Sequence, residues 1–411
     1  MLTVVVAERD SVVVDHQSLI KFSLISKQTL LSARALLYRQ PFFEVDSKDR
    51  SVLQAKAKSI VEVLEFNDNY LGKFVRKTSG ISKWLSAYAK PLRSADMQDE
   101  AGIWYRRILR ACPQLQQVDI SFSSPEDLTE ILEILALLQP AVPDLKPLSK
   151  DSSIRDVTFS RRAGGFDMVN WLNYSYLLKT LKRTSIRSLD NIVFDTTYWI
   201  YLGPGNQEAQ LPFSVKSFQI TSLVGSLSVY LPLLPANPAP LKSFAYIGKL
   251  SCGASVFGKL PSLLPPTLTT LYLCFLDSTD PIALSEYGTP SDCPSIPIEI
   301  FHSFPHLVFL YLCHTAGPSI ELLELLVTSS PALSRVFFNG SEWVSTVNPS
   351  PENVEHLFPE FRVLTILRQF QHLVEINLGV LPTRRKVKYE DLKNSLQTHG
   401  IEVDYDVCKF D

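Results

Sequence analysis

The chain has 411 residues, of which 45% are apolar, and its 40 basic and 42 acidic residues leave a net charge of −2. A nearly neutral chain has no general electrostatic attraction for nucleic acid or an anionic membrane, so neither is expected as a partner. The longest apolar stretch, residues 223–234, is interrupted by serines and by Pro232, so we expect no membrane span.

Two short apolar helices are predicted between residues 19 and 39. The first ends in Ile25-Ser26-Lys27 and the second closes on Leu37-Tyr38-Arg39. This pattern resembles the second half of the F-box in fungal proteins that combine an F-box with leucine-rich repeats. The resemblance implies docking on the small adaptor subunit of a cullin-RING ubiquitin ligase. The adaptor-binding residues carried over by position are Leu19, Phe22, Leu24, Ile25 and Leu30.

The residues before this pattern depart from the F-box. An F-box opens with a leucine-proline helix start and an acidic residue, whereas residues 1–15 contain no proline and read partly as a strand. Only the second half of the motif is therefore matched. The alternative interpretation of residues 19–39 is a helical hairpin that caps the repeats.

Ten hexads of the form apolar-x-x-apolar-x-apolar follow, and each is predicted to be a strand. They are residues 61–66, 115–120, 154–159, 189–194, 215–220, 241–246, 268–273, 307–312, 333–338 and 373–378. In a chain this apolar, about one window in ten matches by chance, so the spacing decides. Four of the steps between neighbouring hexads are 26, 26, 27 and 26 residues.

A nearly constant step of this length is typical of leucine-rich repeats, in which each unit is one strand and one helix. Four hexads have a proline two residues upstream, at Pro113, Pro266, Pro305 and Pro331. Proline ends a helix and releases the chain into an extended conformation. The remaining steps are longer, and the asparagine of the repeat consensus is replaced, so the repeats are irregular.

The predicted fold is therefore an α/β leucine-rich-repeat solenoid with parallel strands on its concave face and a short N-terminal helical module. Residues 1–45 form the partial F-box-like module, and residues 46–411 form the solenoid, with a C-terminal cap from about residue 383. Core helices are expected over residues 128–138 and 320–327, where apolar residues recur at helical spacing.

One aromatic cluster is predicted on the concave face. Stacking of the hexads at 268, 307 and 333 places Tyr272, Phe309, Tyr311 and Phe337 on adjacent strands, with Cys274 and Cys313 in a column beside them. Large contiguous aromatic side chains are typical anchors for a protein partner. The alternative is that the loop between Leu276 and Ile300 folds over these rings and buries them.

Signals for catalysis, a cofactor or a metal are weak. His302 and His306 have metal-like spacing, but Pro305 lies between them and no carboxylate completes a site. Cys274 and Cys313 are interpreted as small buried residues, with a redox or metal pair as the alternative. We expect no enzyme activity, no cofactor and no metal. The six cysteines lack a short-range pairing pattern, which favours reduced thiols in the cytoplasm or nucleus.

The resemblance implies a substrate receptor of a cullin-RING ubiquitin ligase that recognises its protein target on the repeats. The alternative is a leucine-rich-repeat scaffold that binds proteins without the ligase. Binding of the adaptor subunit separates the two.

Overall fold

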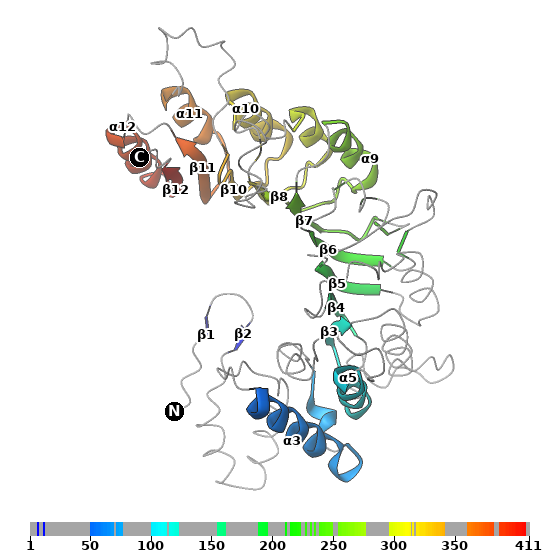
Figure 1. Ribbon diagram of the computed structural model, residues 1–411. Coiled ribbons are helices and arrows are strands. Elements are labelled where there is room, and N and C mark those ends of the chain that lie inside the picture. The colour runs from blue at the N-terminus through cyan, green and yellow to red at the C-terminus, as the bar shows by residue number, and fades with distance from the viewer. Residues whose placement is uncertain are drawn as a thin grey trace, which may run out of the picture. The chain divides into compact units, whose positions relative to one another are not determined.

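A computed structural model describes about half of the chain in detail (Figure 1). The described residues are 6–7, 11–12, 50–69, 71–76, 100–112, 115–122, 154–161, 188–195, 210–211, 214–222, 227, 231, 234–235, 238–249, 254–276, 296–313, 315, 318–341, 360–381 and 386–407. The chain divides into two compact units, Met1–Asp190 and Asn191–Asp411. The division falls inside strand β5 (Ser188–Asp195).

The first unit combines two packed helices with strands. Its elements are β1 (Val6–Ala7), β2 (Ser11–Val12), α3 (Arg50–Asn69), η1 (Gly72–Phe74), α5 (Glu100–Ala111), β3 (Gln117–Phe122) and β4 (Asp156–Arg161). β1 and β2 pair antiparallel, whereas β3 and β4 pair in parallel. Val61 and Leu64 of α3 and Leu109 of α5 are fully buried, which identifies the apolar contact between these helices.

The second unit alternates strands with short helices. Its strands after β5 are β6 (Ser214–Ser222), β7 (Ser243–Lys249), β8 (Thr270–Leu276), β9 (Phe309–Cys313), β10 (Arg335–Phe337), β11 (Glu375–Leu381) and β12 (Glu402–Val407). Its helices are η3 (Ala254–Lys259), α9 (Leu260–Leu263), η5 (Ile298–Ser303), α10 (Ile320–Ser329), α11 (Glu360–Leu367) and α12 (Lys386–Gln397). In Figure 1, α10, α11 and α12 lie on the same side of these strands.

In the second unit, strands β6 to β12 follow one another in chain order in one sheet. Pairing is parallel throughout β6 to β12, and the hexads align position by position. The fourth hexad position forms one buried column across this sheet. It contains Phe218, Phe244, Leu271, Leu310, Val336, Ile376 and Val403. The protein is therefore an α/β protein built on a parallel sheet whose core lies between the strands and the helices.

Nine of the ten predicted strands are found, but the prediction for residues 61–66 is wrong. They lie within helix α3, where Val61 and Leu64 are buried and Phe66 is 74% exposed. The apolar-x-x-apolar spacing that begins the hexad is also the spacing of two residues on one helix face, so the pattern alone did not distinguish them. The tenth strand is β12, in the region predicted as a cap.

Three repeats enter their strands through a turn that contains the predicted proline. The first hexad residue donates its N–H to the carbonyl three residues upstream, at Leu268 to Pro265, Leu307 to Phe304 and Leu333 to Ser330. Pro266, Pro305 and Pro331 therefore occupy the second turn position, which their fixed φ favours. The prediction that these prolines lie where the chain passes into the strand is confirmed.

Hydrogen bonds at the second hexad position join each repeat to the preceding one. The donors are N–H groups and the acceptors are carbonyls, in the pairs Lys242 to Lys216, Thr269 to Lys242, Val308 to Thr269, Ser334 to Val308, Val374 to Ser334 and Glu402 to Val374. The same contact thus recurs through six successive steps. This recurrence is independent of side-chain identity and shows a repeating backbone.

Two hydroxyl side chains link repeats where the consensus asparagine was missing. Thr315 and Ser341 both lie three residues after their hexads, and both are buried. The N–H of Thr315 donates to Oγ of Ser341 at 3.1 Å, and the two hydroxyl oxygens are 3.2 Å apart. Here a Thr–Ser pair satisfies a buried backbone donor.

Two glycines with φ of +76° shape the end of the second unit. Gly379 lies at an irregularity in β11, where its N–H donates to Oδ1 of the buried Asn377 at 2.7 Å. Gly400 ends α12: its N–H donates to the carbonyl of Gln397, and the N–H of Ile401 donates to that of Leu396. These two bonds are the pair of a Schellman motif, which here turns the helix directly into β12.

Several sequence predictions lie outside the described residues. They include the helical module over residues 19–39, its boundary at residue 45 and the helix over residues 128–138. The helix expected over residues 320–327 is α10. Within the parts of the chain that are described, no helix combines the length and apolar character needed to cross a membrane.

Candidate functional site

Four aromatic side chains on three neighbouring strands form the candidate site, which we call the aromatic ladder. It consists of Tyr272 on β8, Phe309 and Tyr311 on β9, and Phe337 on β10. Tyr272 pairs in register with Tyr311, and Tyr311 pairs with Phe337. Their neighbours along the strands, such as Leu271 and Leu310, are fully buried, so the ladder side chains lie on the opposite face.

The rings contact one another directly. Tyr272 and Tyr311 are stacked, with centroids 4.1 Å apart and planes 4° from parallel. Phe337 lies 5.6 Å from Phe309 and 5.8 Å from Tyr311 between centroids. In-register parallel strands lie about 4.8 Å apart, which suits stacking of side chains at equivalent positions. The juxtaposition expected from the hexads is therefore present.

All four rings are half-buried rather than enclosed. Burial raises the pKa of the Tyr272 phenol, and a hydrogen bond with Tyr311 partly offsets the effect. The pKa of the Tyr311 phenol is also raised, chiefly by burial. Both phenols are therefore neutral at physiological pH and offer one apolar face and one polar end. Residues 277–295, most of the loop that was the alternative cover, lie outside the described residues.

Cys274 and Cys313 continue the face beyond the tyrosines. They pair in register, and each is 7% exposed. A hydrogen bond between the thiols, together with burial, raises the pKa of Cys274 far above its ordinary value. Both cysteines are free thiols. Because the thiolate is the reactive form, this environment suppresses thiol chemistry and suits a packing role.

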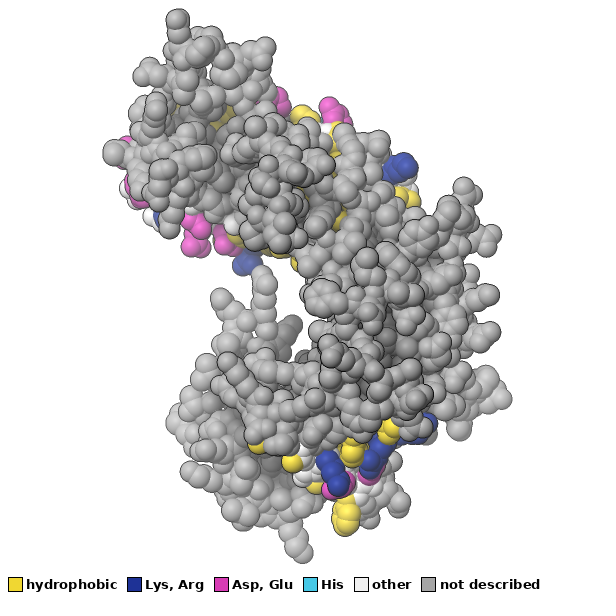
Figure 2. Space-filling model, viewed as in Figure 1, with side chains coloured by type: hydrophobic (Ala, Val, Ile, Leu, Met, Phe, Trp, Pro, Cys, Tyr) yellow, Lys and Arg dark blue, Asp and Glu magenta, His cyan; other side chains and the backbone are white. Residues whose placement is uncertain are grey.

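The face changes from apolar to charged on the side of the ladder toward β12. Arg335 pairs in register with Phe309 on one side and with Glu375 on the other, and its Nε lies 3.4 Å from the Glu375 carboxylate. Glu402 continues this row on β12, and Asp404 is two residues farther along. Both carboxylates are exposed. Figure 2 shows acidic, basic and hydrophobic side chains gathered at the edge of the second unit where β10 to β12 lie.

On the other side of the ladder the described side chains of this face are uncharged. The row of register positions that leads to Phe309 contains Ser217, Ser243 and Thr270. The row that leads to Tyr272 contains Gln219 and Ala245. The aromatic ladder thus lies between a neutral strip and an acidic strip of the same sheet.

Sequence reasoning missed the acidic strip because β12 was not recognised as a strand. A signal was present: Gly400 follows a helical segment, and Ile401, Val403 and Tyr405 then alternate with Glu402 and Asp404. Alternation after a helix-ending glycine is a strand signal. The ion pair between Arg335 and Glu375 was also not predicted.

The other predicted sites add little to this surface. The adaptor-binding residues Leu19, Phe22, Leu24, Ile25 and Leu30 lie outside the described part of the chain. His302 lies in η5 and His306 in the following turn, and both are exposed. Among the described residues, no three His, Cys, Asp or Glu side chains gather as a metal site would require.

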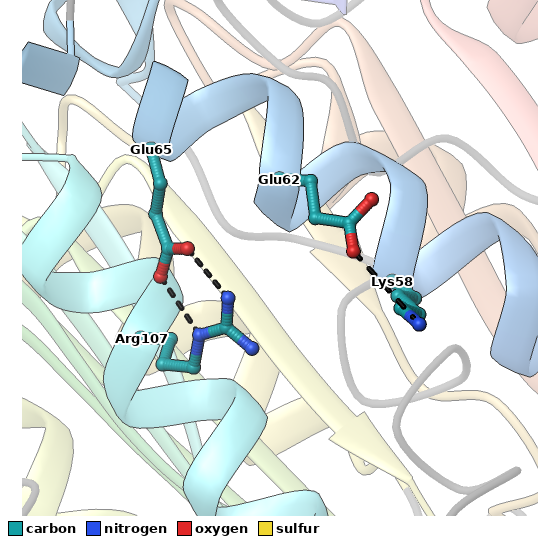
Figure 3. A network of polar contacts seen from close by, with 4 residues as sticks. All are labelled: Lys58, Glu62, Glu65 and Arg107. Carbon is teal, nitrogen blue, oxygen red and sulfur yellow. Dashed lines mark hydrogen bonds and ion pairs between the residues drawn. The ribbon is translucent and has the colours of Figure 1, made fainter. Parts of the chain in front are cut away.

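The polar network in the first unit is structural (Figure 3). Arg107 of α5 binds Glu65 of α3 through two parallel hydrogen bonds, one of them Nε to Oε1 at 2.8 Å. The same guanidinium lies 4.4 Å from the ring centroid of Trp104. Lys58 and Glu62, one helical turn apart on α3, form a second and longer ion pair at 4.0 Å. A bidentate arginine of this kind fixes the register of two helices.

No family model and no curated protein matches this sequence. Among solved structures, the chain is similar to the crystal structure of the yeast Rad7 and Elc1 complex, at 15% identity, with 95% of this chain and 98% of that chain covered. The TM-score is 0.32.

Proposed function

We propose that this protein is a leucine-rich-repeat substrate receptor of a cullin-RING ubiquitin ligase, which holds a protein target on the aromatic ladder. The observation that carries the recognition part is the contiguous, half-buried stack of Tyr272, Tyr311 and Phe337 on neighbouring strands. The ligase part rests on the resemblance of residues 19–39 to an F-box. The receptor itself makes and breaks no bond, and we expect it in the cytoplasm or nucleus.

The chemistry of the ladder favours a protein as the ligand. Aromatic anchors in a preordered array lose little conformational entropy on binding, and they dominate the energetics of many interfaces. Stacking already fixes the rotamers of Tyr272 and Tyr311. Their hydroxyl groups can hydrogen-bond to a partner while the rings pack against its apolar side chains.

Target recognition is tested by affinity capture with the full chain. We expect a target retained by the wild type to be lost with Tyr311→Ala and kept with Phe361→Ala. Phe361 is a matched control because it is an aromatic residue with 82% exposure on helix α11. Equal capture by both variants would remove the ladder from the proposal.

Adaptor docking is tested separately by co-purification with the adaptor subunit. We expect the wild type and Lys21→Ala to retain the adaptor, and Phe22→Ala with Ile25→Ala to lose it. Failure of the wild type to retain the adaptor would reject the ligase role. The absence of proline in residues 1–15 makes a repeat scaffold without ligase association the alternative in that case.

A further inference from the structure

We propose that the partner held on the aromatic ladder is a cationic protein segment, in which an apolar or aromatic side chain packs on the ladder and Lys or Arg binds Glu402 and Asp404. This inference rests on the proposed function and specifies its partner.

Charge is distributed asymmetrically around the ladder. Arg335 is the one cation among the described residues of the face from β9 to β12, and it is paired with Glu375. The carboxylates of Glu402 and Asp404 are exposed, and the structure gives them no cationic partner among the described residues. Asp404 Oδ1 accepts a hydrogen bond from the adjacent N–H of Tyr405. Among the described residues, the surface beside the aromatic rings therefore carries negative charge that no ion pair compensates.

The spacing suits a single bound segment. Phe337 and Asp404 occupy the same row two strands apart, with Asn377 between them. Two strand spacings correspond to about 10 Å, and an extended peptide covers that distance in about three residues. An apolar residue and a cationic residue about three positions apart can thus contact both strips at once.

Two loops that follow ladder strands, one after β8 and one after β10, are poor candidates for the same position. Residues 277–295 contain four acidic residues and no lysine or arginine, and residues 342–359 contain three acidic residues and no lysine or arginine. Either loop would bring negative charge to a negative strip. A nucleic acid is disfavoured for the same reason. A basic segment of another protein gains from charge complementarity and from faster association at low salt.

The test uses the full-length protein and a phage-displayed library of random dodecapeptides. Selected peptides are synthesised, and their Kd is measured by fluorescence polarisation at low and high salt. The informative variant reverses both charges, Glu402→Lys with Asp404→Lys. The control, Glu299→Lys with Glu321→Lys, makes the same change in net charge at exposed positions in η5 and α10.

We expect selected peptides to combine an aromatic or aliphatic residue with an excess of Lys and Arg. Reversal of Glu402 and Asp404 should raise their Kd at least about tenfold, since each exposed ion pair contributes about two- to fivefold and reversal adds repulsion. The control should change Kd by less than about twofold. Added salt should weaken wild-type binding.

The two proposals fail differently. One outcome is that peptide binding is lost with Tyr311→Ala or Phe337→Ala, but the peptides carry no excess of cations or bind the variant Glu402→Lys with Asp404→Lys as tightly as the wild type. That outcome would overturn the cationic partner and leave the ladder proposal intact. If no selected peptide depends on either ring, both proposals are overturned. Circular dichroism and thermal melting verify that every variant is folded.

Discussion

The ring of Tyr272 stacks on the ring of Tyr311, with centroids 4.1 Å apart and 4° between the planes. The two residues are 39 positions apart in the sequence and become neighbours only through the register of β8 and β9. Because each ring covers a face of its partner, the two substitutions should not be independent. The stack thus offers a direct measurement of how firmly adjacent repeats are coupled on this face.

We predict a coupling free energy of about 0.5–1.5 kcal/mol between Tyr272→Ala and Tyr311→Ala, the range of aromatic pairs in contact. Urea unfolding of the wild type, both single variants and the double variant measures it. Tyr272→Ala combined with Phe361→Ala serves as the control cycle, and these effects should add. An additive result for the tyrosine pair would mean that the stack does not persist in solution.

The two phenols should also titrate abnormally. Burial raises the pKa of both above the unfolded value of about 10. The folded state then holds protons that the unfolded state releases, so this contribution is complete below about pH 10 and is lost as pH rises toward the folded pKa. Absorbance at 295 nm should therefore show the same number of tyrosines ionising near pH 10 in the wild type and in the variant Tyr272→Phe with Tyr311→Phe, because neither phenol ionises there in the folded wild type. Ordinary titration of both phenols would contradict their burial.

Gly379 and Gly400 provide a matched pair for alanine substitution. Both have φ of +76°, but a Cβ on Gly379 would clash with the carbonyl oxygens of Ser341 and Phe338, whereas a Cβ on Gly400 meets nothing within 4 Å. We predict a loss of about 1 kcal/mol for Gly400→Ala from backbone strain alone. Gly379→Ala should cost about 2–4 kcal/mol because overpacking is added to the same strain. Chemical denaturation measures both, and equal losses would show that β11 relaxes freely around residue 379.

A second matched pair tests the hydroxyl groups that bridge repeats. Ser341 and Ser334 each form a hydrogen bond with a residue 26 positions earlier in the chain. Ser341 is buried and accepts from the N–H of Thr315, whereas the Ser334 hydroxyl donates to the carbonyl of Val308. We predict that Ser341→Ala costs about 1–3 kcal/mol, because a buried donor loses its partner. Ser334→Ala should cost less than about 0.5 kcal/mol, since the Val308 carbonyl still accepts from two backbone N–H groups. Comparable losses would indicate that water replaces Ser341.

The sequence predicted the ladder because parallel stacking converts alignment of hexads directly into spatial neighbours. Tyr272 and Tyr311 hold the same hexad position, so no knowledge of the intervening loop was needed. The same reasoning failed at residues 61–66, where Val61 and Leu64 satisfy a helix equally well. It also missed β12, whose apolar residues alternate without the first half of the hexad. Periodicity therefore identified nine strands but did not separate a strand from a helix at residues 61–66.

The ion pair of Arg335 with Glu375 lay beyond sequence reasoning for another reason. Their pairing depends on the register of β10 with β11 across a step of 40 residues. The intervening segment has no fixed length in the repeat pattern, so the register had to come from the structure. The Thr315–Ser341 hydrogen bond is a similar case. The sequence shows that both residues replace the consensus asparagine, but it does not show that they bond to each other.

Strands β7 to β11 each pair with the strand before and the strand after them in the chain. Contacts of such short sequence separation close small loops, and a low contact order favours rapid folding that can start in any repeat and spread outward. We expect the earliest protected amides in hydrogen exchange to lie in β8 and β9, where the buried column and the stacked tyrosines reinforce each other. The surface that we assign to recognition would then also be the nucleus from which the rest of the array assembles.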